Sequence, residues 1–522
     1  MTKTDEINQF YCEFSKKIDQ YILAQDHHKL QEMDILCDQY IQEFPEIAFA
    51  LWYCKSNIAA ILTKKNDDLT ISEDVLHSSN LKEKSPIIKI DTTWKPLMYL
   101  RRAVWDQSFD SAPINFKVMI LTNIGNASSN VNRFIEAIEF YNYAIANIPN
   151  FSVALYNRGN LLYKFANWLS ANPEIETDLT PVYFLYNEAL KSFELAFQKD
   201  AVWATSDDNI KIMHKEYDEV IFPNIQSMKI QEVIKNYKFH SDDFFKGSTE
   251  EIAYQKWSLK EHLYLDPINL ITTDNIAGYD YLSLPPYLCR QEEQTPEFFH
   301  WFLLLKQEYI ASRYLLFQSI ELQGKEHFWN ENSDLFTPNE FVLTSYDGSE
   351  KDHQSQFVSG LESALMKASF SKAYGIFDKI AEFIFAFWQL DTKDKKRNKH
   401  ISINNVWYNN LEFKNGINTV LINDTNWFLK GLYHLSYDIV GKEISQEDLL
   451  PEFKRLQEIR NKLEHTEVII TKDTETESLN QLMSISEKDF VKCNLFLLRL
   501  IRNALFYLSL AASLNQSQLK II

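Results

Sequence analysis

The stretch from Phe370 to Leu390, FSKAYGIFDKIAEFIFAFWQL, carries apolar residues at helical spacing. An α-helix completes a turn in about 3.6 residues, so side chains three and four residues apart share one face. The apolar residues on that face are Phe370, Ala373, Phe377, Ile380, Ala381, Ile384 and Trp388. The pattern predicts a long helix that buries this stripe against other helices.

Two further helices are predicted after this stretch, over residues 452–465 and from Lys488 to Leu514. The last is apolar almost all round, which is typical of the central helix of a bundle. It is long enough to cross a membrane, but Arg499 and Arg502 lie inside it. Two charges near the middle of a membrane span would cost on the order of several kcal/mol. We therefore expect a buried helix and no membrane partner.

The predicted helix 452–465 ends in Arg460-Asn461-Lys462-Leu463-Glu464-His465. At about 100° per residue, Asn461 and His465 lie roughly 40° apart on one face of the helix. Arg460 lies about 140° from His465, so it reaches the same site only by wrapping its long side chain or by acting across an interface. This geometry favours a composite site to which two chains each contribute an Arg and a His.

The spacing of this motif is weak evidence by itself. With 11 Arg and 12 His in 522 residues, chance places a His five to seven residues after an Arg roughly 0.8 times. A solvated helix surface is the alternative interpretation, because Arg460 and Glu464 have the spacing of an i,i+4 ion pair, as do Glu458 and Lys462. The Asn directly after Arg favours a functional site. So does the position of the motif at a helix end, before a polar loop over 471–478 and an apolar terminal helix.

Residues 360–515 resemble a HEPN domain, a helical domain found in ribonucleases. The resemblance rests on the motif that ends in His465, the aromatic helix around residues 374–380 and the segment Asn405-Val406-Trp407-Tyr408. It implies a homodimer that cleaves RNA without a metal ion or other cofactor. Its implied catalytic residues are Arg460, Asn461 and His465. Similar long bacterial proteins imply a role as a stress-response or antiviral defence toxin.

These residue types suit RNA cleavage by the ribose 2′-hydroxyl. Imidazole titrates near physiological pH, so His465 can act as general acid or base. Arg460 can bond two phosphate oxygens and stabilise the charge that grows in the transition state. Asn461 can hold the phosphate or orient the histidine. The expected products are a 2′,3′-cyclic phosphate and a 5′-hydroxyl.

A basic run from Lys393 to His400 follows the helix predicted over Phe370–Leu390. Such a run is usually a solvated loop. In an acidic protein it could also steer the RNA backbone toward a site beside it. We therefore assign a supporting or RNA-binding role to Asp378, Lys395, Lys396 and Arg397.

Residues 120–150 fit a tetratricopeptide unit closed by Pro149. Small residues let the two helices of such a unit approach closely, while an aromatic ring fills the space between them. A second unit starts at Ser152 and carries a polar insert around residues 170–181. The residues in register are Leu121, Ile124, Gly125, Ala137, Tyr141 and Ala144 in the first unit, and Leu155, Gly159, Ala189, Phe193 and Ala196 in the second. We expect a degenerate α-solenoid over residues 1–240, with a face that docks a protein partner or regulator.

The complete prediction is an all-α protein with a connecting helical region at 241–355 and a HEPN-like catalytic domain at 356–522. In the connecting region, His262 and His300 lack partners at metal-ligand spacing, so we expect no metal site.

Charge and cysteine content limit the partners and the location. The net charge of −19 argues against a protein that coats nucleic acid through an extended basic face. The five cysteines form no CxxC pair, and the amino terminus lacks an apolar signal region, so we expect a cytoplasmic protein. Two functions remain open: an endoribonuclease, or a non-catalytic interaction protein that uses its helical repeats and dimerises through the terminal bundle.

Overall fold

The computed structural model describes residues 3–65, 93–171, 180–203, 205–230, 232, 234, 245–284, 297–323, 360–390, 400–412, 415–422, 426–439, 451–471 and 483–519. These residues form helices almost throughout, with one pair of short strands. The predicted all-α fold is therefore confirmed. The stretches that carry Lys395, Lys396 and Arg397 lie outside the described residues.

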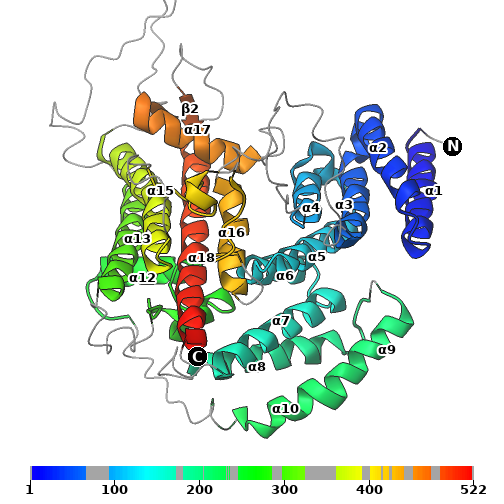
Figure 1. Cartoon of the computed structure of the whole chain (residues 1–522), viewed down its shortest axis with the longest axis horizontal. Coiled ribbons are helices and arrows are strands. Elements are labelled where there is room, and N and C mark those ends of the chain that lie inside the picture. Colours follow the sequence, from blue (N-terminus) through cyan, green and yellow to red (C-terminus); the bar gives the residue numbers. More distant parts are fainter. Residues whose placement is uncertain are drawn as a thin grey trace, which may run out of the picture.

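The amino-terminal helices pack in chain order, each against the next (Figure 1). They are α1 (Lys3–Leu23), α2 (His27–Glu43), α3 (Ala48–Lys65), α4 (Lys95–Trp105), α5 (Ile114–Asn130), α6 (Phe134–Asn147), α7 (Ser152–Ala171) and α8 (Thr180–Ala196). Short 3₁₀ helices at Pro45–Ile47 and Gln107–Ser111 connect some of them, and α9 (Asp207–Glu216), a π-helical turn (Tyr217–Ile221) and α10 (Phe222–Ser227) follow.

Two helix pairs of this array lie where the sequence predicts repeat units. In the pair α5–α6, a Cβ added at Gly125 would lie 2.4 Å from Cε1 of Tyr141. In the pair α7–α8, a Cβ at Gly159 would lie 3.1 Å from ring atoms of Phe193. Each glycine therefore admits the ring of the next helix, which is the packing expected from the sequence. Their assignment to the tetratricopeptide family stays a prediction.

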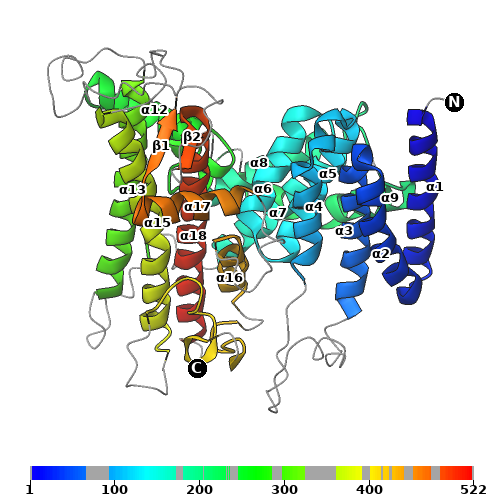
Figure 2. The same ribbon diagram turned by 90° about the horizontal axis from the view of Figure 1, so that it is seen from above.

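The carboxyl-terminal helices surround one long helix, α18 (Glu487–Leu519) (Figures 1 and 2). The elements around it are α12 (Thr249–Lys260), α13 (Glu297–Leu322), α15 (Gly360–Phe387), α16 (Trp427–Ile439) and α17 (Pro451–His465), with 3₁₀ turns at Pro267–Leu270, Asn275–Ala277 and Asn409–Leu411. The stripe quoted from Phe370 to Trp388 is buried throughout, as predicted. Helix α13, from the predicted connecting region, packs along α15.

Helix α18 is the one described helix whose length and composition would allow it to cross a membrane. Within this structure 83% of its apolar window is buried inside the protein. The side chain of Arg502 is fully buried there and pairs with Glu139 of α6. The arginine that interrupts the apolar run is therefore held by an acidic partner from the amino-terminal array.

Two short strands follow α17 and were not predicted. Strand β1 (Val468–Thr471) pairs in parallel with β2 (Met483–Ser486), with Val468 opposite Met483. The β-branched residues of VIIT favour a strand, but four residues give too short a pattern to predict one. The polar loop expected at 471–478 falls almost entirely outside the described residues.

The amino-terminal array and the terminal bundle meet in a buried group of charged and aromatic residues, which we call the joint cluster. It consists of Arg101 of α4, Arg133 and Glu136 beside the α5–α6 turn, Asp438 of α16 and Tyr507 of α18. Beside it, a Cβ at Gly431 of α16 would lie 2.4 Å from the carbonyl oxygen of Asn132 in that turn. Close backbone approach and buried charge thus fix α16 against the array.

Candidate functional site

Helix α17 places the motif by burying one face and exposing the other. Phe453, Leu456 and Ile459 are buried, and the ring of Phe453 lies 5.3 Å from that of Phe496 on α18. Steps of three residues put these side chains on one face, so the residues that follow turn toward solvent. Asn461, Glu464 and His465 are accordingly exposed, and Arg460 is half-buried.

The guanidinium of Arg460 has three neighbours. Its Nε lies 2.9 Å from Oε1 of Glu464, and its Nη1 donates a hydrogen bond to Oδ1 of Asn461 at 3.2 Å. Its carbon Cζ lies 5.6 Å from the ring centroid of Tyr374 on α15. The chain therefore brings Arg460 and Asn461 together and holds the arginine over an aromatic ring.

The imidazole of His465 stands apart from this group. His465 is the last residue of α17, and its side chain is 74% exposed. Its Nε2 lies 4.0 Å from Oε2 of Glu464, which also pairs with Arg460. Within one chain, Glu464 thus lies between Arg460 and His465, two of the three residues that the resemblance assigns to catalysis.

The alternative interpretation of the motif as a solvated helix surface describes part of this arrangement. Arg460 and Glu464 form the i,i+4 pair that their spacing predicts. Glu458 lies 3.8 Å from Nη1 of Arg455, one turn earlier. Exposed pairs of this kind contribute only about 0.5 kcal/mol to stability, so the fold does not depend on them.

Asp378 lies on α15 and holds a neighbouring segment in place. Its Oδ1 accepts a hydrogen bond from the backbone N–H of Ile403 at 3.3 Å. Trp407, four residues later, is fully buried, and its Nε1 donates a hydrogen bond to the carbonyl oxygen of Ile403 at 2.7 Å. The carboxylate thus anchors the segment 400–408, and the basic side chains assigned with it fall on residues that are not described.

Three residues that sequence reasoning did not assign to the site connect the helices around it. The hydroxyl of Tyr374 donates to the carbonyl oxygen of Ile439, the last residue of α16, at 3.4 Å. Nε2 of Gln457 on α17 donates to the same oxygen at 2.8 Å. Burial raises the pKa of Tyr374 to about 12, so its hydroxyl keeps its proton at physiological pH. Tyr374 is far from Arg460 in the sequence, and no local pattern predicts that the two side chains meet.

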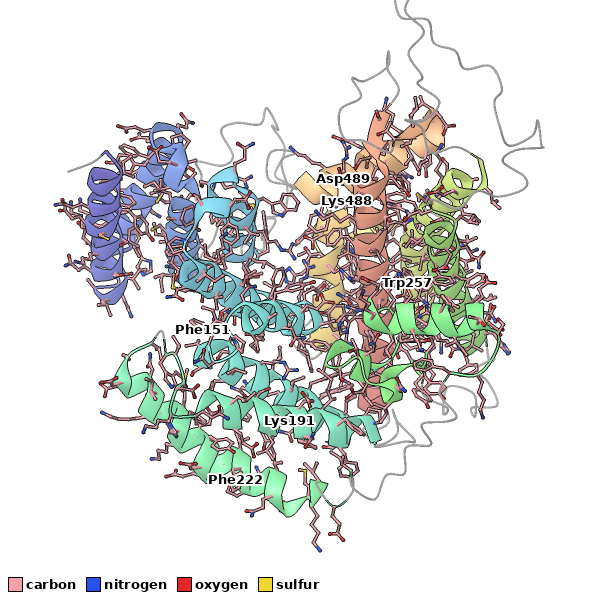
Figure 3. All side chains as sticks on the ribbon, turned by 180° about the vertical axis from the view of Figure 1, so that it is seen from behind. Phe151, Lys191, Phe222, Trp257, Lys488 and Asp489 are labelled. Carbon is pink, nitrogen blue, oxygen red and sulfur yellow. The ribbon has the colours of Figure 1, made fainter. Side chains whose placement is uncertain are left out.

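The surroundings of α17 also carry charged side chains. Lys367 of α15 pairs with Glu467, just beyond the motif. Figure 3 labels Lys488 and Asp489 at the start of α18, and both are exposed. Among the residues that the structure describes, no group of three or more His, Cys, Asp or Glu is placed to hold a metal ion.

Comparison with known proteins places the motif within a recognised domain. No curated protein and no solved structure matches the chain. Residues 289–515 match the family model described as LA2681-like HEPN. The match includes α13, α15, α16, α17 and most of α18, and therefore the whole Arg460–His465 motif. This carboxyl-terminal region belongs to the HEPN superfamily.

Proposed function

We propose that the protein is a metal-independent endoribonuclease with a composite site built from α17 of two copies of the chain. The observation that carries the proposal is the arrangement of the motif within a HEPN region. Arg460 and Asn461 are in contact, whereas His465 is exposed at the helix end and separated from Arg460 by Glu464. A second copy related by a two-fold axis would bring its own His465 to the first copy's Arg460.

In the proposed reaction the 2′-oxygen of a ribose attacks the adjacent phosphorus, and the bond from phosphorus to the 5′-oxygen breaks. The imidazole of His465 takes the proton of the 2′-hydroxyl, and the imidazolium that forms gives this proton to the leaving 5′-oxygen. Arg460 stabilises the charge on the non-bridging oxygens, and Asn461 can donate a hydrogen bond to one of them. The RNA leaves as a 2′,3′-cyclic phosphate and a 5′-hydroxyl end.

The test compares purified full-length wild type with Arg460→Ala and His465→Ala on total RNA in the presence of EDTA. Cleavage by the wild type alone, with cyclic phosphate ends, supports the proposal. Arg455→Ala is the matched control, because Arg455 is 39% exposed on the same helix and also lies near an acidic side chain of that helix, 3.8 Å from Glu458. Its RNA cleavage should equal that of the wild type.

A mixing experiment tests the composite site separately. Arg460→Ala and His465→Ala chains are unfolded together, refolded and assayed. Random pairing makes half of the dimers mixed, and a mixed dimer has one intact site of two if each site takes its Arg and its His from different chains. About a quarter of the wild-type activity should return. No recovery would place both residues of a site in one chain.

The second candidate function is that of a non-catalytic interaction protein. The ion pair between Arg460 and Glu464 favours it, because Glu464 already neutralises the charge that would bind a phosphate. A wild type that leaves RNA uncut under these conditions would support it.

The toxin role belongs to the first proposal and rests on the HEPN match. It predicts that expression in a bacterial host slows growth for the wild type and not for Arg460→Ala. The first proposal also includes RNA as the substrate, a regulator that binds the amino-terminal array, and a cytoplasmic location.

A further inference from the structure

The ring of Tyr374 forms a fixed platform beneath the motif. It stacks on the ring of Phe370 at 6.3 Å and meets the edge of Phe377 at 6.0 Å, with both partners on its own helix. Phe370 and Phe377 are themselves buried. Because its neighbours are packed and its hydroxyl reaches Ile439, Tyr374 has little freedom to change its orientation.

The contacts of Arg460 differ in whether they compete with a phosphate for the guanidinium. Glu464 carries a negative charge and occupies the edge of the guanidinium that would bond a phosphate oxygen. The two anions compete, so phosphate binding requires Arg460 to leave Glu464. The ring of Tyr374 makes no such competition, because it is uncharged and meets the guanidinium through its face, with Cζ of Arg460 over the ring at 5.6 Å from the centroid.

The hydroxyl of Tyr374 connects this platform to the motif helix. Tyr374 of α15 and Gln457 of α17 both donate to the carbonyl of Ile439 at the end of α16. The three helices therefore meet at one oxygen, close to where α17 runs across the bundle (Figures 1 and 2). A displacement of α17 relative to α15 would break this shared contact and move Arg460 away from the ring.

We propose that Tyr374 is a positioning residue for Arg460, holding the guanidinium for a phosphate after its pair with Glu464 opens. The inference rests on the proposed function. The aromatic face of Tyr374 positions Arg460, and the hydroxyl makes a smaller contribution to this positioning. Tyr374→Phe keeps the face and loses the bond to Ile439, while Tyr374→Leu removes both.

The kinetic test measures kcat and KM for a short fluorescent RNA with the full-length variants. Tyr374→Phe should stay within about two-fold of wild type in kcat, and Tyr374→Leu should fall about five-fold, the upper loss expected for a partly exposed cation–π contact. Equal kcat values for Tyr374→Leu and Tyr374→Phe would overturn the proposal, because the aromatic face would then make no contribution.

A readout that does not depend on cleavage completes the test. In protein labelled with ¹⁵N at arginine, the Nε–H signal of Arg460 is identified by its loss in Arg460→Lys. It should shift toward the position of a free arginine in Tyr374→Leu and stay near its wild-type position in Tyr374→Phe. Tyr314→Leu is the control, because Tyr314 lies on α13 in contact with Tyr254 and Glu250 and should leave the signal unchanged.

The two measurements separate the two ideas. A wild type without RNA cleavage sinks the proposed function, and the arginine signal still decides whether Tyr374 holds Arg460. A signal that does not move in Tyr374→Leu overturns the positioning role even if RNA is cleaved. A shift of the Arg460 signal in Tyr374→Leu, together with a lower kcat in Tyr374→Leu than in Tyr374→Phe, supports both proposals.

Discussion

The joint cluster and the motif on α17 use the same kinds of side chain in opposite environments. Arg133 is 2% exposed, and its Nη1 lies 2.5 Å from Oδ2 of Asp438. The side chain of Arg460 is 37% exposed, and its Nε lies 2.9 Å from Oε1 of Glu464. The comparison shows that similar pair distances carry different consequences, because water screens one pair and is excluded from the other.

Burial makes each member of the joint cluster depend on the others. Asp438 faces both Arg133 and Arg101, the latter at 2.9 Å, and Glu136 faces Arg133 at 3.1 Å. Removing one partner leaves a charge without compensation in a dry environment. On α17, the side chains of Arg460 and Glu464 are partly exposed, so water can compensate when one of these two partners is removed. The first arrangement suits a structural connection, and the second suits a residue that must exchange its partner for a ligand.

The largest expected effect is therefore at Asp438. Asp438→Ala leaves Arg101 and Arg133 facing each other without their shared carboxylate, and should lower the free energy of unfolding by about 3–5 kcal/mol. Urea unfolding followed by tryptophan fluorescence measures this. The matched control is Asp208→Ala, because that carboxylate pairs with Lys211 on an exposed helix surface and should have almost no effect. Equal effects would show that burial does not distinguish the two kinds of pair.

An intermediate effect is expected from Tyr507 at alkaline pH. Burial, followed by the nearby charge of Glu136, raises the pKa of Tyr507 well above its usual value of 10.0. The folded protein therefore keeps this proton where the unfolded chain loses it. The stability that the neutral tyrosine contributes is complete below pH 10, and is lost as pH rises toward the folded pKa. The slope is up to about 1.4 kcal/mol per pH unit.

Tyr507→Phe isolates this contribution. The variant loses the 2.6 Å hydrogen bond that the Tyr507 hydroxyl donates to Glu136, and should begin about 1–3 kcal/mol less stable. Its unfolding midpoint should then fall less steeply than that of the wild type between pH 10 and pH 11. Parallel slopes for the two proteins would mean that Tyr507 does not titrate between the folded and unfolded states.

The smallest effect is expected at the motif itself. Arg460→Ala should change the free energy of unfolding by about 0.5 kcal/mol or less, because it removes an exposed ion pair and a half-exposed ring contact. Thermal unfolding of Arg460→Ala and of Arg455→Ala should give the same midpoint as the wild type. A large loss of stability for Arg460→Ala alone would place this arginine with the joint cluster.

The two regions are also connected through α17. Besides pairing with Asp438, Arg101 lies with its Cζ 5.7 Å from the ring of Phe453, at the start of the motif helix. Asp438 in turn directly precedes Ile439, whose carbonyl accepts from Tyr374 and Gln457. Helix α4 of the amino-terminal array thus touches the same helices that hold Arg460.

The sequence determined the features that depend on local spacing. Apolar residues three and four apart predicted the buried stripe of α15, and the apolar run with two arginines predicted a buried α18. Gly125 and Gly159 marked the close helix pairs of the array. The position of the motif at the end of α17 also followed from the sequence, since helix ends and helix faces are set by neighbouring residues.

The tertiary structure alone decided which distant side chains meet. Arg101 and Asp438 are 337 residues apart, and nothing in their local sequence selects one as the partner of the other. The contact of Tyr374 with Arg460 and the separation of His465 from Arg460 likewise depend on how α15 and α17 cross. Periodicity identifies the buried face of a helix, but the partner across that face is chosen by packing of the whole chain.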